Sequence, residues 1–565
     1  MPDTELDAIA SSRVYGATFL SVENMTSSID APVDAPVLII GGGPVGLATS
    51  LDLGRRGIRS ILVERDKGTG VELLAKAGTL NERTMEICRF WGIADAVAQC
   101  GFPDDVNLDT LYCTALDGFL IGVDPRPATL DRVQPAGAVE ILRKCPQFLF
   151  DPILAKAAAA TGQVELLYSH RFEALEQDAS AVRATVADVD SGATRTLCGR
   201  YLIACDGAGS RIRRSLNIEF PGRMLSYSVS AMLTAKLDDS RFGVRNRYMF
   251  VDENGTWANL TSVDGRHLWR FTLVGNEAKL DPAVHDISMD IARAFGPHIP
   301  FEVLRVLPWR RSQCTAEKYR IGNVFLAGDA AHTTSPTGGH GLNTGIGDAF
   351  ALGWMLHAVL TGQSGDGLLD SYETERRPVA IRNSSISTEN FSSWIAAANF
   401  GGVLAPGKKG DQIRARIGAE MSAALQQEWT STGVALGYRY EGSPLIVPDG
   451  TPEPPDPAES YQQTARPGHR APHLWLADGR STIDLFGIGY VLLRFDPAVD
   501  VSGLIAAAGD RGLDLKLVDI DEAAVAAAYE RSLVLVRPDA HVCWRDDVAP
   551  EGLQAEQLIA RIVGD

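Results

Sequence analysis

The spacing of apolar and polar residues changes several times along the chain, and each change predicts a different element. From Ala35, the sequence PVLIIGGGPVGLATSLDLGRRGIRSILVERD joins a short apolar run, a glycine-rich turn, a longer apolar stretch and a second short run. This order predicts a buried strand, a helix and a second strand parallel to the first. Residues 84–92 and 146–161 have a helical pattern, and RYLIACDGAGSRIRRSL predicts another buried strand, a turn and the start of a helix.

A strand-rich segment begins at about Leu225. In RYMFVDENGTWANLTSVDGRHLWRFTLVG, apolar and polar residues alternate, and DENG and DGRH are typical of hairpin turns. We therefore expect an antiparallel sheet inserted into the α/β domain. The later GNVFLAGDAAH returns to a buried strand, a long helix is predicted over residues 344–360, and strand and helix patterns resume after about His469.

These patterns predict an α/β protein with a small additional α/β domain at the C-terminal end. The proline-rich PDGTPEPPDP marks a surface crossing before that domain. The predicted segments are an N-terminal arm (1–34), the two parts of the main α/β domain (35–215 and 309–400), the inserted sheet domain (216–308), a helical and loop connection (401–470) and the C-terminal domain (471–565).

The composition limits the classes of molecule that the protein is expected to bind. The formal net charge of -18 argues against a nucleic acid or an anionic membrane surface. The acidic start MPDTELDAIA does not resemble a signal peptide, and DAFALGWMLHAVL is too short to span a membrane. Eight cysteines without a CxxC pair are typical of buried thiols in a reducing compartment rather than of a metal or dithiol site. We therefore expect a cytoplasmic protein without a bound metal.

The stretch GGGPVG, residues 41–46, matches the GxGxxG pattern that binds dinucleotides when it joins a strand to a helix. Gly41 permits the tight turn, Gly43 lets the backbone approach a pyrophosphate, and Gly46 lets the helix pack on the strand. The helix N-terminus attracts the phosphate charge, and Glu64 at the end of the second strand would accept hydrogen bonds from ribose hydroxyls. This pattern alone does not distinguish FAD from NAD.

Two further motifs follow predicted strands far downstream, CDGAGSRIR at residues 205–213 and GDAAH at residues 328–332. An elongated dinucleotide lying across a sheet needs contacts from several strand ends. The three motifs in this order, with the last extended to GDAAHxxxPxGGxGLNxGxxDA, resemble the group A flavin-dependent aromatic hydroxylases, the para-hydroxybenzoate hydroxylase-like monooxygenases. KAGTLNERTMEICRFWGIAD, CPQFLFDPIL and LLDSYETERRPVA look most like the phenol and 2,4-dichlorophenol hydroxylase branch. The resemblance covers roughly residues 35–565.

The resemblance implies a Rossmann-like FAD-binding domain, an inserted antiparallel sheet that binds the substrate, a C-terminal thioredoxin-like domain without CxxC, and a homodimer, which is common in the family. It also implies a set of FAD contacts. These are Gly41, Gly43, Pro44 and Gly46 at the pyrophosphate, Glu64 and Arg65 at the adenosine end, Lys76, Gln147 at the ribityl chain, Asp206, Gly207, Asp329 at the ribityl or pyrophosphate region, and Pro336, Gly341, Leu342 and Asn343 at the flavin ring.

For several of these positions, the resemblance implies a specific physical role. Lys76 stands where many members have an arginine that reaches the cofactor phosphates, and lysine keeps the charge but loses the planar fork. Asp206 and Gly207 belong to the motif that faces both FAD and the nicotinamide cofactor. Leu342 and Asn343 would offer backbone N–H groups near N1 and O2 of the flavin, where such donors stabilise the negative charge built by reduction.

The implied reaction is hydroxylation of a phenolic or polycyclic aromatic substrate with O2, with NADH or NADPH as reductant, through a flavin C4a-hydroperoxide. The cofactor supplies the chemistry while the protein positions the ring and excludes water. One alternative is another flavin reaction on the same fold, a halogenase or a reductase, and a second is a non-catalytic flavin-binding protein. The absence of a WxWxIP motif argues against the halogenase, and the full set of cofactor positions argues against the non-catalytic protein.

A base or polar relay that takes up the phenolic proton is expected, but its position is open. Phenol hydroxylases of the yeast type have an aspartate where this chain has Gly78. The inserted sheet offers Tyr248, His267 and Arg270 as candidates. A structural role on the sheet surface or in the core explains each of these three more readily.

The histidine and tryptophan residues near these motifs are expected to be structural. His332 and His340 lie in the glycine-rich stretch, and we expect them to pack and orient the turn rather than transfer protons. Trp257 and Trp269 could wall an aromatic pocket, but tryptophans in sheets usually pack in the core.

Overall fold

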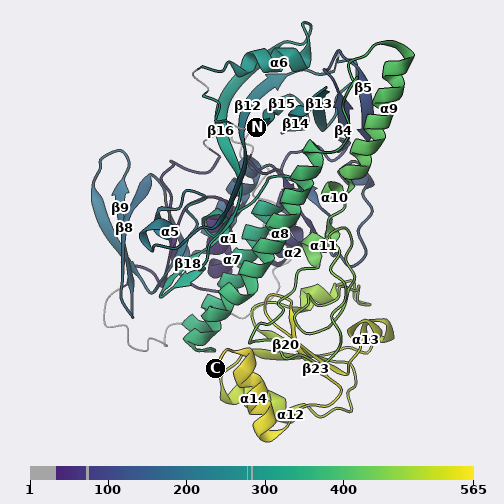
Figure 1. The fold of residues 1–565 in the computed structure, drawn as a ribbon. Helices are drawn as coiled ribbons and strands as arrows, with labels where there is room; N and C mark the ends of the chain where they lie inside the picture. Colours follow the sequence, from purple (N-terminus) through teal and green to yellow (C-terminus); the bar gives the residue numbers. More distant parts are fainter. Residues whose placement is uncertain (1–32, 71–75, 239, 277, 282–283) are drawn as a thin grey trace, which may run out of the picture. The chain divides into compact units, whose positions relative to one another are not determined.

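A computed structural model of the protein describes residues 33–70, 76–238, 240–276, 278–281 and 284–565 (Figure 1). By its internal contacts, Val33–Asp565 forms one unit. The predicted N-terminal arm, residues 1–34, lies outside the described residues except for Val33 and Asp34. Within the described part of the chain, no helix combines the length and the apolar character needed to cross a bilayer.

A six-stranded sheet in the order β17-β18-β11-β1-β2-β7 carries the glycine motifs. Its strands from β18 to β7 pair in parallel, as the first pattern predicts for β1 and β2, and β17 is an antiparallel edge. Every residue of β1, β2, β11 and β18 is buried, as expected for a parallel sheet with both faces covered. The strands are β1 (Val37–Ile40), β2 (Ser60–Val63), β7 (Val164–Leu167), β11 (Tyr201–Ala204), β17 (Arg320–Ile321) and β18 (Val324–Leu326).

The helices predicted over residues 84–92, 146–161 and 344–360 are present as α2 (Glu82–Phe90), α4 (Gln147–Ala160) and α7 (His340–Leu360). The start of α7 is earlier than predicted because its first turns are rich in glycine, a poor helix former, and are held helical by burial. The other helices before the C-terminal sheet are α1 (Pro44–Arg55), α3 (Ala94–Ala98), α5 (Arg211–Ser215), α6 (Ile287–Phe295), α8 (Ser371–Ile395), α9 (Gly407–Ala424), α10 (Gln426–Trp429) and α11 (Thr432–Leu436).

The large antiparallel sheet extends beyond the predicted 216–308 segment, in the order β19-β16-β12-β15-β14-β13-β4-β5. Two of its strands come from residues 110–124, and β4 pairs in parallel with β13. The sequence pattern does not reveal β4, because all of its residues are buried and apolar–polar alternation is lost. The strands are β4 (Thr110–Cys113), β5 (Leu120–Asp124), β12 (Gly222–Ala235), β13 (Arg247–Asp252), β14 (Gly255–Ser262), β15 (Leu268–Asn276), β16 (Phe301–Thr315) and β19 (His332–Thr333).

The two faces of this sheet pack against different helices. On one face, Tyr248 and Trp269 form a core with Phe295 of α6. On the other face, Met249 packs with Trp394 of α8. Because neighbouring side chains of a strand point to opposite faces, one residue of register decides which core a side chain enters. Figure 1 shows α8, which begins beside the C-terminal part of the chain and ends against this sheet.

The C-terminal residues form a four-stranded sheet in the order β21-β20-β22-β23. Buried ion pairs tie this part to the rest: Arg470 Nε lies 3.0 Å from Glu86 of α2, and Arg537 Nη1 lies 2.6 Å from Glu375 of α8. All eight cysteines are free thiols, and burial raises the pKa of Cys543. The elements are β20 (Tyr490–Arg494), α12 (Ser502–Asp510), β21 (Leu515–Asp519), α13 (Ala523–Tyr529), β22 (Leu533–Val536), β23 (Val542–Asp546) and α14 (Gly552–Ile562).

Two small sheets complete the described structure, β10-β9-β8 and β3-β6. The second joins Thr79 to Lys144 and so fixes two segments that are far apart in the sequence. The strands are β3 (Thr79–Leu80), β6 (Arg143–Lys144), β8 (His170–Gln177), β9 (Val182–Asp188) and β10 (Thr194–Gly199).

Candidate functional site

The turns that carry the predicted motifs lie at one edge of the parallel sheet. Gly41 follows β1, Glu64 follows β2, Asp206 follows β11, and the Gly328–Asp329 turn follows β18. Since these strands are parallel, their carboxyl ends meet at the same edge, which is where open α/β sheets bind their ligands. The three sequence motifs are therefore brought together.

Each glycine of the GxGxxG pattern at residues 41–46 meets a different structural requirement. Gly41 has φ +111°, and a Cβ there would lie 2.3 Å from the carbonyl oxygen of Cys205. A Cβ on Gly46 would lie 1.9 Å from the carbonyl oxygen of Gly41. Gly43 has no atom within 4 Å of its Cβ position, so the N-terminus of α1 stays open beside it. Gly41 and Gly46 are thus required by packing, whereas Gly43 leaves room for a phosphate at a helix N-terminus.

The Glu64 carboxylate is fixed beside the fingerprint. Its Oε2 accepts a hydrogen bond from the Gly42 N–H at 2.5 Å, and its Oε1 accepts one from the Asp66 N–H at 2.9 Å. Arg65 and Lys76 are exposed. The rigid position of Glu64 suits a carboxylate that accepts hydrogen bonds from a ribose.

Two buried carboxyl oxygens, Asp206 Oδ1 and Asp151 Oδ1, have no hydrogen-bond partner among the described residues. The second oxygen of Asp206 accepts from the Arg211 N–H at 2.7 Å, and that of Asp151 accepts from Gln147 Nε2 at 3.1 Å. Buried polar atoms without a partner are rare and indicate a missing donor. The ribityl and ribose hydroxyls of FAD are donors of this kind, so these residues fit the cofactor.

Asp151 is not among the residues predicted from the sequence. It stands one helical turn after Gln147 in α4, and this spacing on one helix face is the signal that could have found it. Burial raises the pKa of Asp151 to about 7, against the opposing hydrogen bond from Gln147 and the charge of Lys76. The Asp151 carboxyl can therefore be protonated near neutral pH.

Asp329 lies in the turn after β18, at the same edge of the sheet. Its side chain is accessible to solvent, yet desolvation by the surrounding protein raises the pKa of its carboxyl. The charges of His332 and Lys76 oppose this shift. Since Lys76 acts electrostatically on both Asp151 and Asp329, its positive charge reaches the same edge of the sheet as the two carboxyls.

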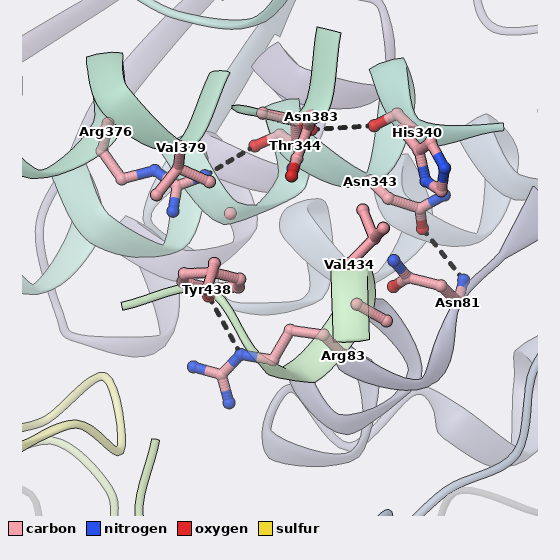
Figure 2. A pocket seen from close by; sticks show the side chains of 12 residues that line it. Asn81, Arg83, His340, Asn343, Thr344, Arg376, Val379, Asn383, Val434 and Tyr438 are labelled. Carbon is pink, nitrogen blue, oxygen red and sulfur yellow. Dashed lines mark hydrogen bonds between the residues drawn. The ribbon is translucent and has the colours of Figure 1, made fainter. Parts of the chain in front are cut away.

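The segment before and within the first turn of α7 presents backbone rather than side chains. Gly338 and Gly339 have φ of +88° and +71°, and Pro336 is exposed. The side chain of Asn343 points back into the protein, where its Oδ1 accepts from the Asn81 N–H at 3.0 Å (Figure 2). The first four N–H groups of an α-helix have no acceptor within the helix, so those of α7 through Asn343 are available to a ligand.

The cavity drawn in Figure 2 lies between α2, α7, α8 and residues 434–438, and has room for about one water molecule. Its lining is largely hydrogen-bonded already: Arg83 Nε donates to the Tyr438 hydroxyl at 3.1 Å, and Asn383 Nδ2 donates to Thr344 Oγ1 at 3.0 Å. His340 Nε2 is buried without a partner among the described residues. This cavity is therefore too small to hold an aromatic substrate, and most of its polar side chains already have hydrogen-bond partners.

Both histidines of the glycine-rich stretch are buried. His332 Nε2 lies 2.7 Å from Asp348 Oδ2, a contact that fixes the GDAAH turn on α7. Burial lowers the pKa of His340 to about 4, so its ring is neutral at physiological pH. These contacts agree with orienting roles.

The three base candidates from the sheet are in three different surroundings. Tyr248 lies in the core with α6, and its hydroxyl donates to the Gly243 carbonyl, so it faces away from the cofactor edge. His267 is exposed directly before β15. Arg270 alone reaches a cofactor segment, because its Nη1 donates to the Lys76 carbonyl at 3.0 Å. Trp257 and Trp269 also pack on the α6 side of the sheet.

The position of Gly78 faces a cation. Lys144 Nζ lies 4.0 Å from the place that a Cβ on Gly78 would occupy. The aspartate found here in yeast-type phenol hydroxylases would therefore stand against an ammonium group in this protein. The sequence gives no local signal for Lys144, which is brought here by the pairing of β6 with β3.

Comparisons with known proteins agree with this geometry. A family model described as an FAD binding domain matches residues 34–386, and one described as aromatic-ring hydroxylase, C-terminal, matches residues 464–565. Tetracenomycin A2 monooxygenase-dioxygenase of Streptomyces glaucescens is 32% identical, with 94% of this chain and 98% of that protein covered. 4-Methyl-5-nitrocatechol 5-monooxygenase of a Burkholderia species is 31% identical, with 95% of this chain and 99% of that protein covered.

Solved structures agree as well. RebC soaked with chromopyrrolic acid and holding 7-carboxy-K252c has a TM-score of 0.87 at 36% identity, with 94% of this chain and 100% of that chain covered. The ternary complex of aklavinone-11 hydroxylase with FAD and aklavinone has a TM-score of 0.79 at 27% identity, with 95% of this chain and 100% of that chain covered. The chain therefore belongs to the FAD-binding-domain family of aromatic-ring hydroxylases and is an FAD-dependent aromatic monooxygenase.

Proposed function

We propose that the protein transfers one oxygen atom of O2 to a phenolic or polycyclic aromatic substrate, with NADH or NADPH as reductant. The observation that carries this proposal is the junction between the cofactor edge and the large sheet. Strand β19 follows the GDAAH turn and is itself an edge strand of that sheet, paired with β16. A substrate held under the sheet would thus lie beside the cofactor edge.

The residues at this edge suit FAD. Gly41, Gly43, Pro44 and Gly46 would hold the pyrophosphate, Glu64 and Arg65 the adenosine, and Lys76 the phosphate charge. Gln147, Asp151, Asp206, Gly207 and Asp329 would bind the ribityl and pyrophosphate region. Pro336, Gly341, Leu342 and Asn343 would lie against the flavin ring. The two unpartnered carboxyl oxygens and the open space at Gly43 support this assignment.

When bound, FAD supplies the redox and oxygen chemistry. The N–H groups in the first turn of α7 would stabilise negative charge at the flavin ring, since fixed backbone donors need no reorganisation. Asn343 contributes by holding that turn against β3, because its Nδ2 donates to the Thr79 carbonyl at 3.1 Å. The large sheet, with α8 behind it, would cover the substrate and exclude water.

Finer assignments belong to the same proposal. The motifs around Gly78 and in α4 support the phenol and 2,4-dichlorophenol hydroxylase branch, while relatives named for tetracenomycin and for nitrocatechol support testing both polycyclic and single-ring substrates. We also assign the sheets to a Rossmann-like FAD-binding domain, an inserted substrate domain and a thioredoxin-like C-terminal domain, within a homodimer.

The test uses the purified full-length protein loaded with FAD. Oxidation of NADH and of NADPH is followed together with O2 uptake against single-ring and polycyclic phenols, and products are analysed after reaction under isotope-labelled O2. The expected result is a phenol-stimulated oxidation that yields a product with one labelled oxygen. A reductase would give products without the label, a halogenase would require halide, and a non-catalytic protein would give no stimulated turnover.

A further inference from the structure

Two thiols lie side by side near the segments proposed to hold FAD. Cys100 follows α3, and Cys145 stands between β6 and α4. The Sγ of Cys100 donates to the carbonyl of Lys144 at 3.4 Å, and this carbonyl carbon is bonded to the backbone nitrogen of Cys145. The thiols of Cys100 and Cys145 also form a hydrogen bond with each other. No CxxC motif announces this pair in the sequence, because the fold brings its members together from two distant segments.

The two thiols differ in exposure and in acidity. Cys100 is half-buried, whereas Cys145 is buried. The hydrogen bond from the Cys145 thiol lowers the pKa of Cys100 to about 7, while burial opposes this shift and a backbone hydrogen bond at Phe102 adds to it. The same contact between the thiols, together with burial, raises the pKa of Cys145. At neutral pH, Cys100 is therefore partly a thiolate that solvent can reach, and a protonated thiol lies beside it.

This combination is typical of cysteines that react with peroxides. The thiolate is the nucleophile, and a redox-sensitive cysteine joins a low pKa to exposure and to a second cysteine nearby. Four other thiols of the chain are in the opposite situation, because burial raises their pKa and keeps them protonated at neutral pH. These are Cys88, Cys113, Cys205 and Cys543.

The backbone around Cys145 is tied to residues that we propose as FAD contacts. The Cys145 N–H donates to the Gly78 carbonyl at 3.1 Å, and the Gln147 N–H donates to the Ala77 carbonyl at 2.9 Å. Gln147 Nε2 donates in turn to Asp151 Oδ2 at 3.1 Å. A displacement of Cys145 is therefore passed on to the start of α4, which carries both Gln147 and Asp151.

We propose that hydrogen peroxide converts Cys100 and Cys145 into a reversible disulfide, and that this bond weakens the binding of FAD. In the first step, the Cys100 thiolate attacks one peroxide oxygen. An S–O bond forms, the O–O bond breaks, and the released hydroxide takes up a proton and becomes water.

In the second step, the Cys145 sulfur attacks the sulfur of the Cys100 sulfenic acid. An S–S bond forms and the S–O bond breaks, and the leaving hydroxide takes the Cys145 proton and becomes a second water. In total, the two thiols lose two electrons and two protons, and one peroxide is reduced to two waters.

The effect on FAD follows from the movement that the bond requires. The sulfurs of a disulfide lie about 2.0 Å apart, much closer than the sulfurs of two hydrogen-bonded thiols. Forming the bond draws Cys145 towards the end of α3 and away from its position in the reduced protein. Because Gln147 and Asp151 follow directly in α4, their fit to FAD becomes poorer. This part of the inference rests on the FAD contacts in the proposed function, whereas the disulfide itself does not.

The first test looks for the bond in the full-length protein. FAD-free protein is treated with hydrogen peroxide, its remaining thiols are alkylated, and it is digested with trypsin. Trypsin releases Cys100 within residues 90–132 and Cys145 within residues 145–156. We expect mass spectrometry to find these two peptides joined after peroxide and separate after dithiothreitol. Fragmentation of the joined peptides should place the bond at Cys100 and not at Cys113, which lies in the same peptide.

Substitutions separate the roles of the two thiols. In Cys145→Ser, peroxide should leave Cys100 as a sulfenic acid that dimedone traps, and Cys100→Ser should give neither product. Cys198→Ser, at another half-buried cysteine, is the matched control and should form the disulfide as the parent does. Peroxide should raise the dissociation constant of FAD at least about threefold in the parent and in Cys198→Ser, but not in Cys100→Ser. Dithiothreitol should restore the original affinity.

Other outcomes overturn the inference at identifiable points. If the peptides of the parent stay separate, or if residues 145–156 are joined to the peptide of Cys88 (84–89) instead, the proposed pair is wrong. A disulfide that leaves FAD affinity unchanged refutes the coupling to the cofactor. An equal loss of affinity in peroxide-treated Cys100→Ser places the sensitive group elsewhere. If the reduced parent binds no FAD, the proposed FAD contacts fail, while the masses of the peptides still decide whether the disulfide forms.

Discussion

His332 Nε2 lies 2.7 Å from Asp348 Oδ2, and both side chains are buried. The same carboxylate accepts hydrogen bonds from the Gly328 N–H at 3.1 Å and from Arg376 Nε at 3.0 Å. Burial alone would raise the pKa of Asp348, but the charges of His332 and Arg376 outweigh it and lower that pKa. Asp348 therefore ties the GDAAH turn to α7 and α8, and His332 is one of the groups that hold it.

Replacing His332 should affect stability and cofactor retention rather than proton transfer. In His332→Leu, the buried Asp348 carboxylate loses one partner, which should lower the free energy of unfolding by about 1–3 kcal/mol. Urea unfolding measures this loss, and the pH profile of kcat/KM with saturating FAD tests the role. The profile should keep its shape. His298→Leu, at an exposed histidine outside the candidate site, is the control, and loss of one limb of the profile only in His332→Leu would show a proton-transfer role.

Substitutions at the glycines of the GxGxxG pattern should separate effects on folding from effects on FAD binding. A Cβ at position 46 would lie 1.9 Å from the Gly41 carbonyl oxygen, whereas the Cβ position of Gly43 is open. Gly46→Ala should destabilise the FAD-free protein by about 1–3 kcal/mol through overpacking. Gly43→Ala should leave the FAD-free protein near parental stability but weaken FAD binding, because the added methyl group occupies the cofactor's space. Thermal unfolding without FAD and FAD titration distinguish the two, and equal stability losses would contradict this division of roles.

The motif residues are predictable from the sequence because their requirements are local. A tight turn, a close backbone approach and a helix start each need glycine within a few residues of the strand end. The GGGPVG, CDGAG and GDAAH turns can therefore be recognised from the sequence alone. The convergence of these turns follows once the strands are parallel and adjacent, since their carboxyl ends then share an edge.

The residues of the sheet face are not predictable in this way. Alternation shows that Arg247 and Tyr248 point to opposite faces, but it does not show which face meets the cofactor. Of the three candidates from the sheet, Tyr248 lies on the α6 face, whereas Arg270 shares with Arg247 the face turned towards α8. Lys144 is placed beside Gly78 by the two-residue pairing of β6 with β3. Arg311 of β16 donates a hydrogen bond to Ser335, which lies in the segment before α7. Such contacts depend on tertiary packing and leave no periodic signal.

Asp151 should make the stability of the FAD-free protein depend on pH. Burial raises the pKa of this carboxyl from 3.8 to about 7. The folded state then binds the proton more tightly than the unfolded state, so stability falls as pH rises from about 4 through about 7. Asp151→Asn keeps an acceptor for Gln147 and should stabilise the FAD-free protein by about 1–3 kcal/mol above pH 7, with a smaller gain at about pH 5. Urea unfolding across this range measures the difference. A gain that is independent of pH would contradict the assignment, and Asp105→Asn, at an exposed carboxyl, should change little.

The opposite pH dependence is expected for Glu86, which joins α2 to the C-terminal part of the chain. Burial opposes ionisation of Glu86, but the charges of Arg470 and Arg83 outweigh it and lower its pKa from 4.5 to about 2. Because the folded-state pKa is the lower one, the stabilisation is present above about pH 4.5 and is lost as pH falls towards 2.

Glu86→Gln should therefore destabilise the protein by about 3–5 kcal/mol at neutral pH, because it leaves two buried arginines without their counter-charge. The difference from the parent should shrink as the pH is lowered. Urea unfolding at neutral and acidic pH, with the fluorescence of tryptophans in both parts of the chain as the signal, checks both statements. The exposed pair of Arg416 and Glu420, 2.8 Å apart on α9, provides the control, and Glu420→Gln should cost at most about 0.5 kcal/mol. Equal effects of the two substitutions would mean that the buried ion pair does not hold the C-terminal part in place.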